Sequence, residues 1–534
     1  MVNSQQGRYS ISRDIYGVNS GVDQNLANEL KLPVQRWGGD STSRYNWKQD
    51  STNAGFDWFF VGGSGVSTPT PNATVATVLA STKASSGKAI ITMPMVGYLT
   101  SSNLVSSSNP QGLIQDGVLT GRTITGRVSY INSTSQMNCS YPVSLYGAQQ
   151  SVNPYVTVTV NGVSGVQCGN SLNSSGTELP VLTEQQKLLN SVYSTPAWDQ
   201  QWIQYLTQTY GTAANGGVNI YQLDNEPSGW ANTHRDIRPV APTGAEITQM
   251  ALIEAPAIKA VDPTALVLGP SDFGWQVYNP TTGYSQSYLS AMAAYEKQHG
   301  QRILDYFDQH FYPFETGVAN LPAGSAATQA LRLASTRSLW DPTYVDQSWV
   351  NAPITLIPTF HKYVNQNYPG TKIAITEYNF GGLESVNGAL AEADVLGIFA
   401  REQLDLATMW SPPTSSQPAA FSFRIYLNYD AQGSYFGETY VQSSSADQTQ
   451  LAIYSAQRSC DQSLTLVVVN KTANNIVSQL NLAGFAPDKN AQVYNYSSAN
   501  LNAIVRRPDM PVTATGFAAM YPANSLTMIV IPQQ

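Results

Sequence analysis

Two glutamates stand where a buried strand is expected to end, and together they suit acid/base hydrolysis. Glu226 follows the apolar run 218–221 and comes directly before Pro227, which cannot continue a central strand. Glu377 follows the β-branched run 372–376. Cleavage of a sugar acetal needs one carboxylic acid to protonate the leaving oxygen and one carboxylate to attack or to activate water. One such glutamate would be interpreted as a cap or an ion-pair partner, but two favour a catalytic pair.

Other motifs accompany both glutamates in a fixed order along the chain. The two glutamates themselves lie in Asp224-Asn225-Glu226-Pro227 and Thr376-Glu377-Tyr378-Asn379. The remaining motifs are Tyr16-Gly17-Val18-Asn19, Arg36-Trp37-Gly38-Gly39, Arg44-Tyr45-Asn46-Trp47, Asn53-Ala54-Gly55-Phe56-Asp57-Trp58, Asn232-Thr233-His234-Arg235-Asp236, Trp410-Ser411-Pro412-Pro413-Thr414 and Phe423-Arg424-Ile425-Tyr426. With them, the sequence closely resembles glycoside hydrolase family 44, the endoglucanases and xyloglucanases. The resemblance covers most of the chain, whereas Asn-Glu-Pro alone is common among barrel glycosidases.

The resemblance implies a role for each glutamate. In that family the glutamate of Asp-Asn-Glu-Pro is the acid/base and that of Thr-Glu-Tyr-Asn is the nucleophile, which assigns Glu226 and Glu377 here. These roles agree with a retaining double displacement. Glu226 must keep its proton near neutral pH, so we expect burial and the charge of Glu377 to raise its pKa. Glu377 must stay ionised, so we expect hydrogen-bond donors beside it, with Arg36 and Tyr312 as candidates.

Polar residues near these motifs are candidates for binding substrate. Asn225 is placed to bind the sugar 2-hydroxyl, as in similar barrel enzymes, and a turn-forming role is its alternative. His310 stands at a strand end and Tyr378 follows Glu377, so both join the substrate-binding candidates, as do Arg36 and Tyr312. Asp224 should point away from Glu226 because neighbouring residues of a strand alternate. After Asp224, the next candidate carboxylates are Asp272 and Glu384, for which a solvated or loop-bracing role is favoured. His234 is expected to support its loop.

Tryptophan rings form a second group of candidates, because a flat aromatic face matches the C–H face of a pyranose. Some of them must belong to the core. We expect Trp230 and Trp410 to contact substrate before the others. The full set is Trp37, Trp47, Trp58, Trp230 and Trp410.

Composition excludes several classes of protein. The chain has 27 Lys+Arg against 35 Asp+Glu and a net charge of -8, so it lacks the basic face that nucleic acid requires. No run approaches the ~18 apolar residues of a membrane span. Its polarity lies in hydroxyl and amide side chains and 30 Tyr, which suits neutral carbohydrate. The hydrolysis needs no metal or cofactor and no His/Cys ligand cluster is evident, although the resemblance leaves a structural calcium ion open.

The first residues and the cysteines bear on the compartment. Met1 to Gln6 show neither the basic start nor the apolar core of a signal peptide. Because an enzyme that degrades a polymer must reach it outside the cell, we expect a secreted monomer whose signal peptide has been removed. Cys139 and Cys168 bracket a strand-rich insertion, and a bridge between them would stabilise it by ~3 to 4 kcal/mol. The alternative is that these two and Cys460 are buried thiols.

Alternating strand and helix patterns predict an α/β fold, a (β/α)8 TIM barrel over residues 15–442 with its active site at the C-terminal ends of the strands. The expected strands are 15–19, 32–37, 88–95, 218–221, 265–272, 303–313, 372–376 and 406–410, and the clearest helices are 198–210, 251–260 and 389–403. A β-rich insertion near 101–185 is expected to form a flap. Within it, the alternating run 155–160 meets Asn161-Gly162, a strong hairpin signal.

The sequence pattern changes near residue 443, where short alternating strands separated by turns predict an all-β sandwich over 443–534. These strands are 451–454, 464–469, 492–496 and 526–531. The resemblance implies that residues 1–14 join this smaller domain as its N-terminal strand. A brace for the barrel is favoured over a carbohydrate-binding module, because no clear row of exposed aromatics is present.

The sequence therefore predicts a retaining endo-β-1,4-glucanase that hydrolyses β-1,4-glucans such as cellulose-type glucans, carboxymethylcellulose and xyloglucan. Fold alone fixes neither sugar nor linkage, so a xylanase, mannanase or arabinofuranosidase is the alternative among enzymes. A carbohydrate-binding protein that has lost activity is the alternative from another class. The presence of both Glu226 and Glu377 argues against it. We expect a polysaccharide as the partner, and neither nucleic acid nor membrane.

Overall fold

The structure, a computed structural model, describes residues 1–55, 70–100 and 191–534, together with short elements between these ranges. The short elements are β6 (Gly62–Gly63), β9 (Ile114–Gln115), β10 (Val118–Leu119), β11 (Ile124–Thr125), β12 (Ser129–Tyr130), β13 (Met137–Asn138), β14 (Val156–Val160), β15 (Val163–Cys168) and α3 (Glu184–Lys187). The chain divides into two compact units. One contains residues 1–35, 83–87 and 311–534, and the other contains residues 36–82 and 88–310.

Eight strands close into a barrel in the order β17-β18-β19-β20-β21-β3-β4-β7. They are β3 (Gly17–Asn19), β4 (Val34–Trp37), β7 (Lys88–Met93), β17 (Ile220–Leu223), β18 (Leu266–Phe273), β19 (Tyr306–His310), β20 (Lys372–Tyr378) and β21 (Leu406–Met409). Their order around the barrel is their order along the chain, and each of the eight lies on a predicted strand. The predicted fold class is confirmed.

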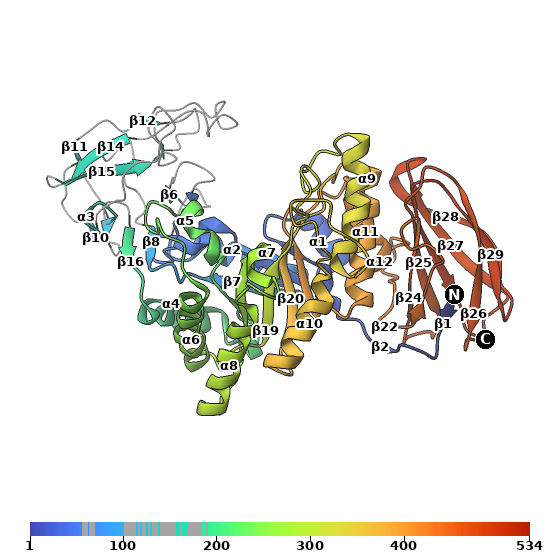
Figure 1. Ribbon diagram of the computed structural model, residues 1–534, viewed down its shortest axis with the longest axis horizontal. Coiled ribbons are helices and arrows are strands. Elements are labelled where there is room, and N and C mark those ends of the chain that lie inside the picture. The colour runs from blue at the N-terminus through green and yellow to red at the C-terminus, as the bar shows by residue number, and fades with distance from the viewer. Residues whose placement is uncertain are drawn as a thin grey trace. The chain divides into compact units, whose positions relative to one another are not determined.

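Helices alternate with these strands (Figure 1). They are α1 (Gln24–Leu30), α2 (Ala73–Ala84), α4 (Pro196–Tyr210), α5 (Trp230–Thr233), α6 (Gly244–Val261), α7 (Trp275–Tyr278), α8 (Ser285–His299), α9 (Ala326–Ser335), α10 (Leu356–Asn367), α11 (Val386–Arg401) and α12 (Pro418–Leu427). No helix in the described ranges is long and apolar enough to span a membrane.

Local sequence explains where the main helices begin. At α6 the side chain of Thr243 accepts a hydrogen bond from the N–H of Glu246, whose carboxylate accepts one from the N–H of Thr243. This capping box starts the helix at Gly244, earlier than the predicted residue 251. At α4, Thr195 is the cap and Pro196 takes the first helical position, where its missing N–H costs nothing.

The predicted hairpin in the insertion is present. β14 and β15 pair antiparallel, and Val160 lies opposite Val163, so Asn161-Gly162 connects them. The proposed bridge between Cys139 and Cys168 lies outside what the structure describes, because Cys139 and the side chain of Cys168 are not among the described parts.

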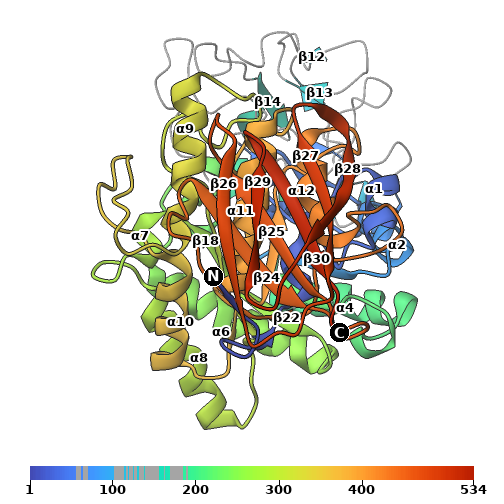
Figure 2. The same cartoon turned by 90° about the vertical axis from the view of Figure 1, so that its right-hand side faces the viewer.

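The C-terminal strands form two sheets, which Figure 2 shows nearly face on. The larger has the order β2-β22-β24-β25-β30-β27-β28 and the smaller β23-β1-β26-β29. Their strands are β1 (Val2–Asn3), β2 (Tyr9–Ser10), β22 (Thr439–Tyr440), β23 (Gln442–Ser443), β24 (Leu451–Gln457), β25 (Leu464–Asn470), β26 (Ile476–Ala483), β27 (Asn490–Ser497), β28 (Asn500–Pro511), β29 (Gly516–Tyr521) and β30 (Ser525–Ile531).

Apolar side chains from both sheets share one core, as in a sandwich. Val2 belongs to this core, and β1 pairs antiparallel with β23 and parallel with β26. Residues near the N-terminus therefore contribute one strand to each sheet, β1 to the smaller and β2 to the larger.

Helix α11 lies between the sandwich and β20 and is buried on all sides from Gly388 to Ala400. The hydroxyl of Tyr454 on β24 donates to Asp394 at 2.7 Å, and Lys471 pairs with the same carboxylate at 2.6 Å. A Cβ on Gly397 would lie 2.2 Å from the Tyr454 ring, so only glycine allows this approach. The sandwich is thus packed directly against a barrel helix.

Candidate active site

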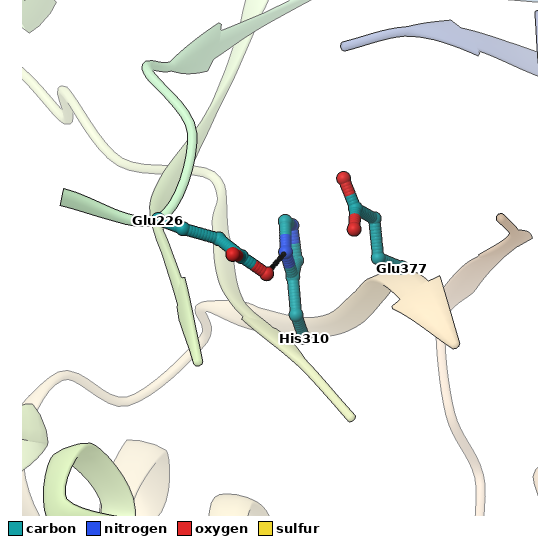
Figure 3. A group of neighbouring side chains, drawn as sticks. All are labelled: Glu226, His310 and Glu377. Carbon is teal, nitrogen blue, oxygen red and sulfur yellow. Dashed lines mark hydrogen bonds and ion pairs between the residues drawn. The ribbon is translucent and has the colours of Figure 1, made fainter. Parts of the chain in front are cut away.

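Glu226 is held in a strained turn just after β17. Its backbone is left-handed, with φ 44°, and Asp224 is also left-handed, with φ 59°. The N–H of Glu226 donates to the carbonyl oxygen of Ser271 at 2.9 Å. Its Oε1 atom lies 2.8 Å from Nδ1 of His310, the last residue of β19, as Figure 3 shows. The Glu226 side chain remains 16% exposed while that of His310 is buried, so the carboxyl can meet a ligand from one side.

Asn225 is fixed by neighbours on both sides of its amide. Arg36 on β4 is fully buried and donates from Nε to Gln222 at 2.5 Å and from Nη2 to Oδ1 of Asn225 at 2.7 Å. The amide nitrogen of Asn225 donates to Asp40 at 2.9 Å. These contacts set the amide orientation, which a residue that recognises one sugar hydroxyl requires.

Glu377 lies inside β20 rather than after it. It is 4% exposed, and its carbonyl oxygen accepts a hydrogen bond from the N–H of Phe311. The hydroxyl of Tyr312 donates to its Oε2 atom at 2.9 Å. A donated hydrogen bond favours the ionised form of a carboxylate, as a nucleophile needs. The expected contact between Tyr312 and Glu377 is therefore present.

Asp224 and His234 support this region from inside. The Asp224 carboxylate accepts hydrogen bonds from the N–H groups of Met95 and Asn225, and burial raises its pKa to about 7. Its carboxylate meets Met95 rather than Glu226 because Asp224 is itself left-handed. Strand alternation was the wrong reason for this prediction, since β17 ends at Leu223 and residues two apart in a strand share a face. Burial lowers the pKa of His234 to about 3, so its ring is neutral.

Three of the predicted tryptophans have no ring face for a sugar. Trp230 is fully buried, and its Nε1 donates to the carbonyl oxygen of Asn225 at 3.0 Å. Trp37 is buried edge-on against Tyr45, and Trp47 is buried against the Tyr205 and Trp198 rings. The stacking role predicted for these three is therefore wrong, because tertiary packing uses their faces.

Trp410 differs from these rings. Its backbone N–H donates to the carbonyl oxygen of Tyr378 at the end of β20. The residue is 38% exposed, so its ring is open to a ligand. Trp58 lies outside the described residues.

Tyr378 is also placed differently from the prediction. Its ring is fully buried and edge-on to Phe399, and its hydroxyl donates to Glu392 of α11 at 2.8 Å. Neighbouring strand residues face opposite ways, so the strand that presents Glu377 must turn Tyr378 toward the helix layer. It is not a substrate contact.

Two supporting residues were not predicted. Asp40 holds Asn225, and Tyr284 donates to Asp272 at the end of β18. Asp272 and Glu384 were predicted to be solvated or to brace loops. Asp272 is fully buried and accepts from Ser228, whereas Glu384 is exposed and accepts from the N–H of Ala323 at 2.6 Å. Only the end of the apolar run 265–272 marked Asp272 in the sequence; the other contacts depend on tertiary structure.

A parallel closed barrel that carries glutamates at the ends of β17 and β20, each with its own hydrogen-bonding partner, defines a barrel glycoside hydrolase. The glutamates and the His310 imidazole are also metal-ligand types.

Comparisons place the chain within that class. Residues 120–315 match glycoside hydrolase family 44. The solved structure of CelM2, a bifunctional glucanase-xylanase from a metagenome library, is 32% identical with a TM-score of 0.83, covering 100% of this chain and 98% of that one. This chain belongs to glycoside hydrolase family 44.

Two further relatives are similar over most of the chain. Endoglucanase A of Paenibacillus lautus is 27% identical over 88% of this chain, which spans 63% of that relative's length. Cel44A, the family 44 endoglucanase of Clostridium thermocellum, is 25% identical with a TM-score of 0.75, covering 99% of this chain and 98% of that one. The chain spans less than two thirds of the length of the curated relatives it matches.

Proposed function

We propose that this chain is a retaining endo-β-1,4-glucanase in which Glu226 is the acid/base and Glu377 the nucleophile. One observation carries the proposal: two glutamates with different supports end β17 and β20 of a single closed barrel. The C-terminal ends of barrel strands open at one mouth, where such enzymes bind their substrates.

The first step forms a glycosyl-enzyme. Glu226 gives its proton to the glycosidic oxygen while a Glu377 oxygen attacks the anomeric carbon, so the bond to the leaving sugar breaks and an ester forms on Glu377. The hydrogen bond from Tyr312 keeps Glu377 ionised before attack. His310 orients the Glu226 carboxyl toward the leaving oxygen.

The second step returns the enzyme. Glu226, now a carboxylate, takes a proton from water, and the resulting hydroxyl displaces Glu377 from the anomeric carbon. The sugar leaves with its original configuration, and both carboxyls regain their starting protonation. Asn225, fixed by Arg36 and Asp40, is suited to donate to the sugar 2-hydroxyl in both steps.

The substrate class is proposed from the relatives and from the composition. The named relatives include endoglucanases, and one is described as a glucanase-xylanase. A neutral, hydroxyl-rich polymer suits a chain with few charges, and Trp410 offers a ring for a sugar face. We therefore propose β-1,4-glucan, including xyloglucan, as the preferred substrate, with xylan as the alternative to be tested.

Product release from carboxymethylcellulose, xyloglucan, mannan and xylan tests this proposal directly. We expect the wild type to cut a β-1,4-glucan internally, with a rapid fall in viscosity, and to release products whose first NMR-detected anomer is β. Glu226→Gln and Glu377→Gln should each lose most activity. A wild type that cuts only xylan or mannan would contradict the substrate, and α-anomers would contradict retention.

We also propose that the reaction needs no metal ion, because an acid and a nucleophile suffice for hydrolysis. EDTA treatment should leave kcat unchanged; a loss restored by a divalent cation would contradict this. If EDTA lowers thermal stability instead, and calcium restores it, a structural calcium ion is present. Secretion and action as a monomer are part of the same proposal and are tested by fractionation of the producing cells and by light scattering.

A further inference from the structure

The turn that carries Glu226 is held by hydrogen bonds to two consecutive residues at the end of β18. Ser271 accepts the Glu226 N–H through its carbonyl oxygen at 2.9 Å. Asp272 accepts the N–H of Ser228 at 3.3 Å and the hydroxyl of Ser228 at 2.5 Å. Between these grips, the N–H of Gly229 donates to the carbonyl oxygen of Glu226 at 2.8 Å and closes a single turn over residues 227–229.

The Asp272 carboxylate is built into this place. It is fully buried, and it also accepts the N–H of Phe273 at 2.9 Å and the hydroxyl of Tyr284 at 2.6 Å. A buried carboxylate with donors on both oxygens has one favoured orientation. Its strand is locally irregular, with a register shift between Pro270 and Asp272 and a left-handed Ser271, so the carboxylate is directed to Ser228 by its own strand.

A left-handed backbone is unfavourable for glutamate and persists only where the surroundings impose it. Glu226 has that conformation, and its Oε1 meets His310 from it. If the turn over 227–229 relaxed, Glu226 would return to an ordinary φ and its carboxyl would move away from His310. The grip on Ser228 is therefore connected to the position of the Glu226 carboxyl.

We propose that Asp272 is a positioning residue for Glu226: its carboxylate fixes Ser228 and so keeps Glu226 in the left-handed conformation that aims its carboxyl at the leaving oxygen. This inference rests on the proposed role of Glu226 as acid/base. Asp272 touches neither substrate nor Glu226 and acts through the turn. Ser228 links Asp272 to the turn, and Tyr284 donates a second hydroxyl that orients the Asp272 carboxylate.

The test compares substrates whose leaving groups do and do not need a proton from the acid. Aryl β-cellobiosides with a poor leaving group, such as phenol, require the acid, whereas 2,4-dinitrophenol leaves without it. For a retaining enzyme, kcat/KM reports only formation of the glycosyl-enzyme, so the later base step does not interfere. Asp272→Asn should lower kcat/KM by about 10- to 100-fold for the phenyl substrate and by less than about 3-fold for the dinitrophenyl substrate.

A matched control lies at the other end of the same structural segment. Asp262 precedes β18, is also buried, and accepts the N–H and the hydroxyl of Thr264 at 3.0 and 2.6 Å, as Asp272 does from Ser228. Asp262→Asn should change both substrates by the same factor. If Asp272→Asn fails to fold, Ser228→Ala and Tyr284→Phe test the same grip by removing one hydroxyl each, and should show smaller losses confined to the phenyl substrate.

The outcomes separate this inference from the proposed function. Glu226→Gln must show the same leaving-group dependence with a larger loss; equal losses on both substrates would overturn the acid role and the inference together. If Glu226→Gln behaves as expected but Asp272→Asn slows both substrates equally, or neither, Asp272 only stabilises the fold. The inference is supported if Asp272→Asn changes the ratio of kcat/KM between the phenyl and dinitrophenyl substrates and Asp262→Asn does not.

Discussion

The ends of β17 and β20 present the same functional group by different means. Glu226 stands beyond its strand in a left-handed turn, whereas Glu377 lies within its strand on extended backbone. The strand around Glu377 is irregular, because its register with β21 shifts between Ile375 and Tyr378. The N–H of Phe311 and the hydroxyl of Tyr312 donate to Glu377 there. The left-handed turn is held by the end of β18 and by His310. Glu226 is thus positioned by a turn held from β18 and β19, whereas Glu377 is positioned by its own strand together with Phe311 and Tyr312.

The difference agrees with the two proposed tasks. An acid must reach an oxygen of the departing chain, and the Glu226 side chain keeps 16% exposure. A nucleophile attacks one carbon along one line, and Glu377 is only 4% exposed. We expect changes near Glu226 to affect proton transfer and changes near Glu377 to affect bond formation to carbon.

The largest effect should come from removing either carboxylate. Glu377→Ala should lower kcat/KM on glucan by at least ~10⁴-fold and Glu226→Ala by ~10² to 10⁴-fold, because only the first removes the attacking group. Azide distinguishes them: it should give an α-glycosyl azide with Glu377→Ala and a β-glycosyl azide with Glu226→Ala, both seen by NMR. The opposite products would exchange the two roles.

The next largest effect should come from His310, which acts on the Glu226 side alone. His310→Ala should lower kcat/KM on glucan by about 10- to 100-fold, because the carboxyl loses the partner that orients it. Steady-state kinetics on phenyl and dinitrophenyl cellobiosides checks this, since the loss should fall on the phenyl substrate. The control is His361→Ala. His361 lies in α10, and its Nε2 is 2.8 Å from the carbonyl oxygen of Glu402. An equal loss on both substrates would place His310 outside proton transfer.

A smaller effect is expected on the Glu377 side. Tyr312→Phe removes one hydrogen bond to the carboxylate and should lower kcat/KM by about 3- to 10-fold on both aryl substrates alike. Tyr288→Phe removes another buried tyrosine hydroxyl and should have no such effect. Kinetics of Tyr312→Phe indistinguishable from wild type would remove Tyr312 from the site.

The smallest effect on catalysis, but a measurable one on stability, should come from Glu392 behind β20. Burial raises its pKa from 4.5 to about 8, so between these pH values the folded chain holds a proton that the unfolded chain has released. This group therefore favours folding most below about pH 4.5, and that contribution is lost as pH rises toward 8.

Glu392→Gln removes this titration while keeping a hydrogen-bonding partner for Tyr378. At pH 8 the variant should gain on the order of a few kcal/mol in the free energy of unfolding relative to wild type, so its Tm should be several degrees higher. At pH 4.5 the two Tm values should differ little. Thermal melts at both pH values provide the measurement, with Asp488→Asn on the surface as the control. A wild type and variant that keep the same Tm difference at both pH values would contradict the titration.

Much of this comparison could be predicted from local sequence. The apolar run before Glu226 and the β-branched run before Glu377 each specify a strand, so the approximate position of both glutamates followed. Eight strands in order gave the barrel for the same reason. β17 ends at Leu223, at the left-handed Asp224, and not at Pro227 as expected. Strand alternation places residues two apart on the same face, so it could not support the prediction for Asp224 relative to Glu226. Applied to the neighbours Glu377 and Tyr378, it would have excluded Tyr378 from the site.

Other features depend on contacts that no local pattern encodes. Whether Trp230 or Trp410 keeps an open face is decided by what packs on it from other segments, and both have Ser and Pro within a few residues. The left-handed φ of Glu226 likewise depends on β18. In the sandwich, β28 was not predicted because it is largely exposed and has no apolar alternation to reveal it.

The position of β1 has a consequence for how the protein is made. Residues 2–3 lie between β23 and β26 in the smaller sheet, and β26 begins at Ile476, so the ribosome must add about 470 residues before this neighbour exists. At ~5 to 20 residues per second, the nascent strand waits roughly 25 to 95 seconds without a partner. Its apolar Val2 is then available to chaperones or to a neighbouring nascent chain. Completion of the sandwich must follow synthesis of the barrel strands, so a pause late in translation would prolong the exposure of β1.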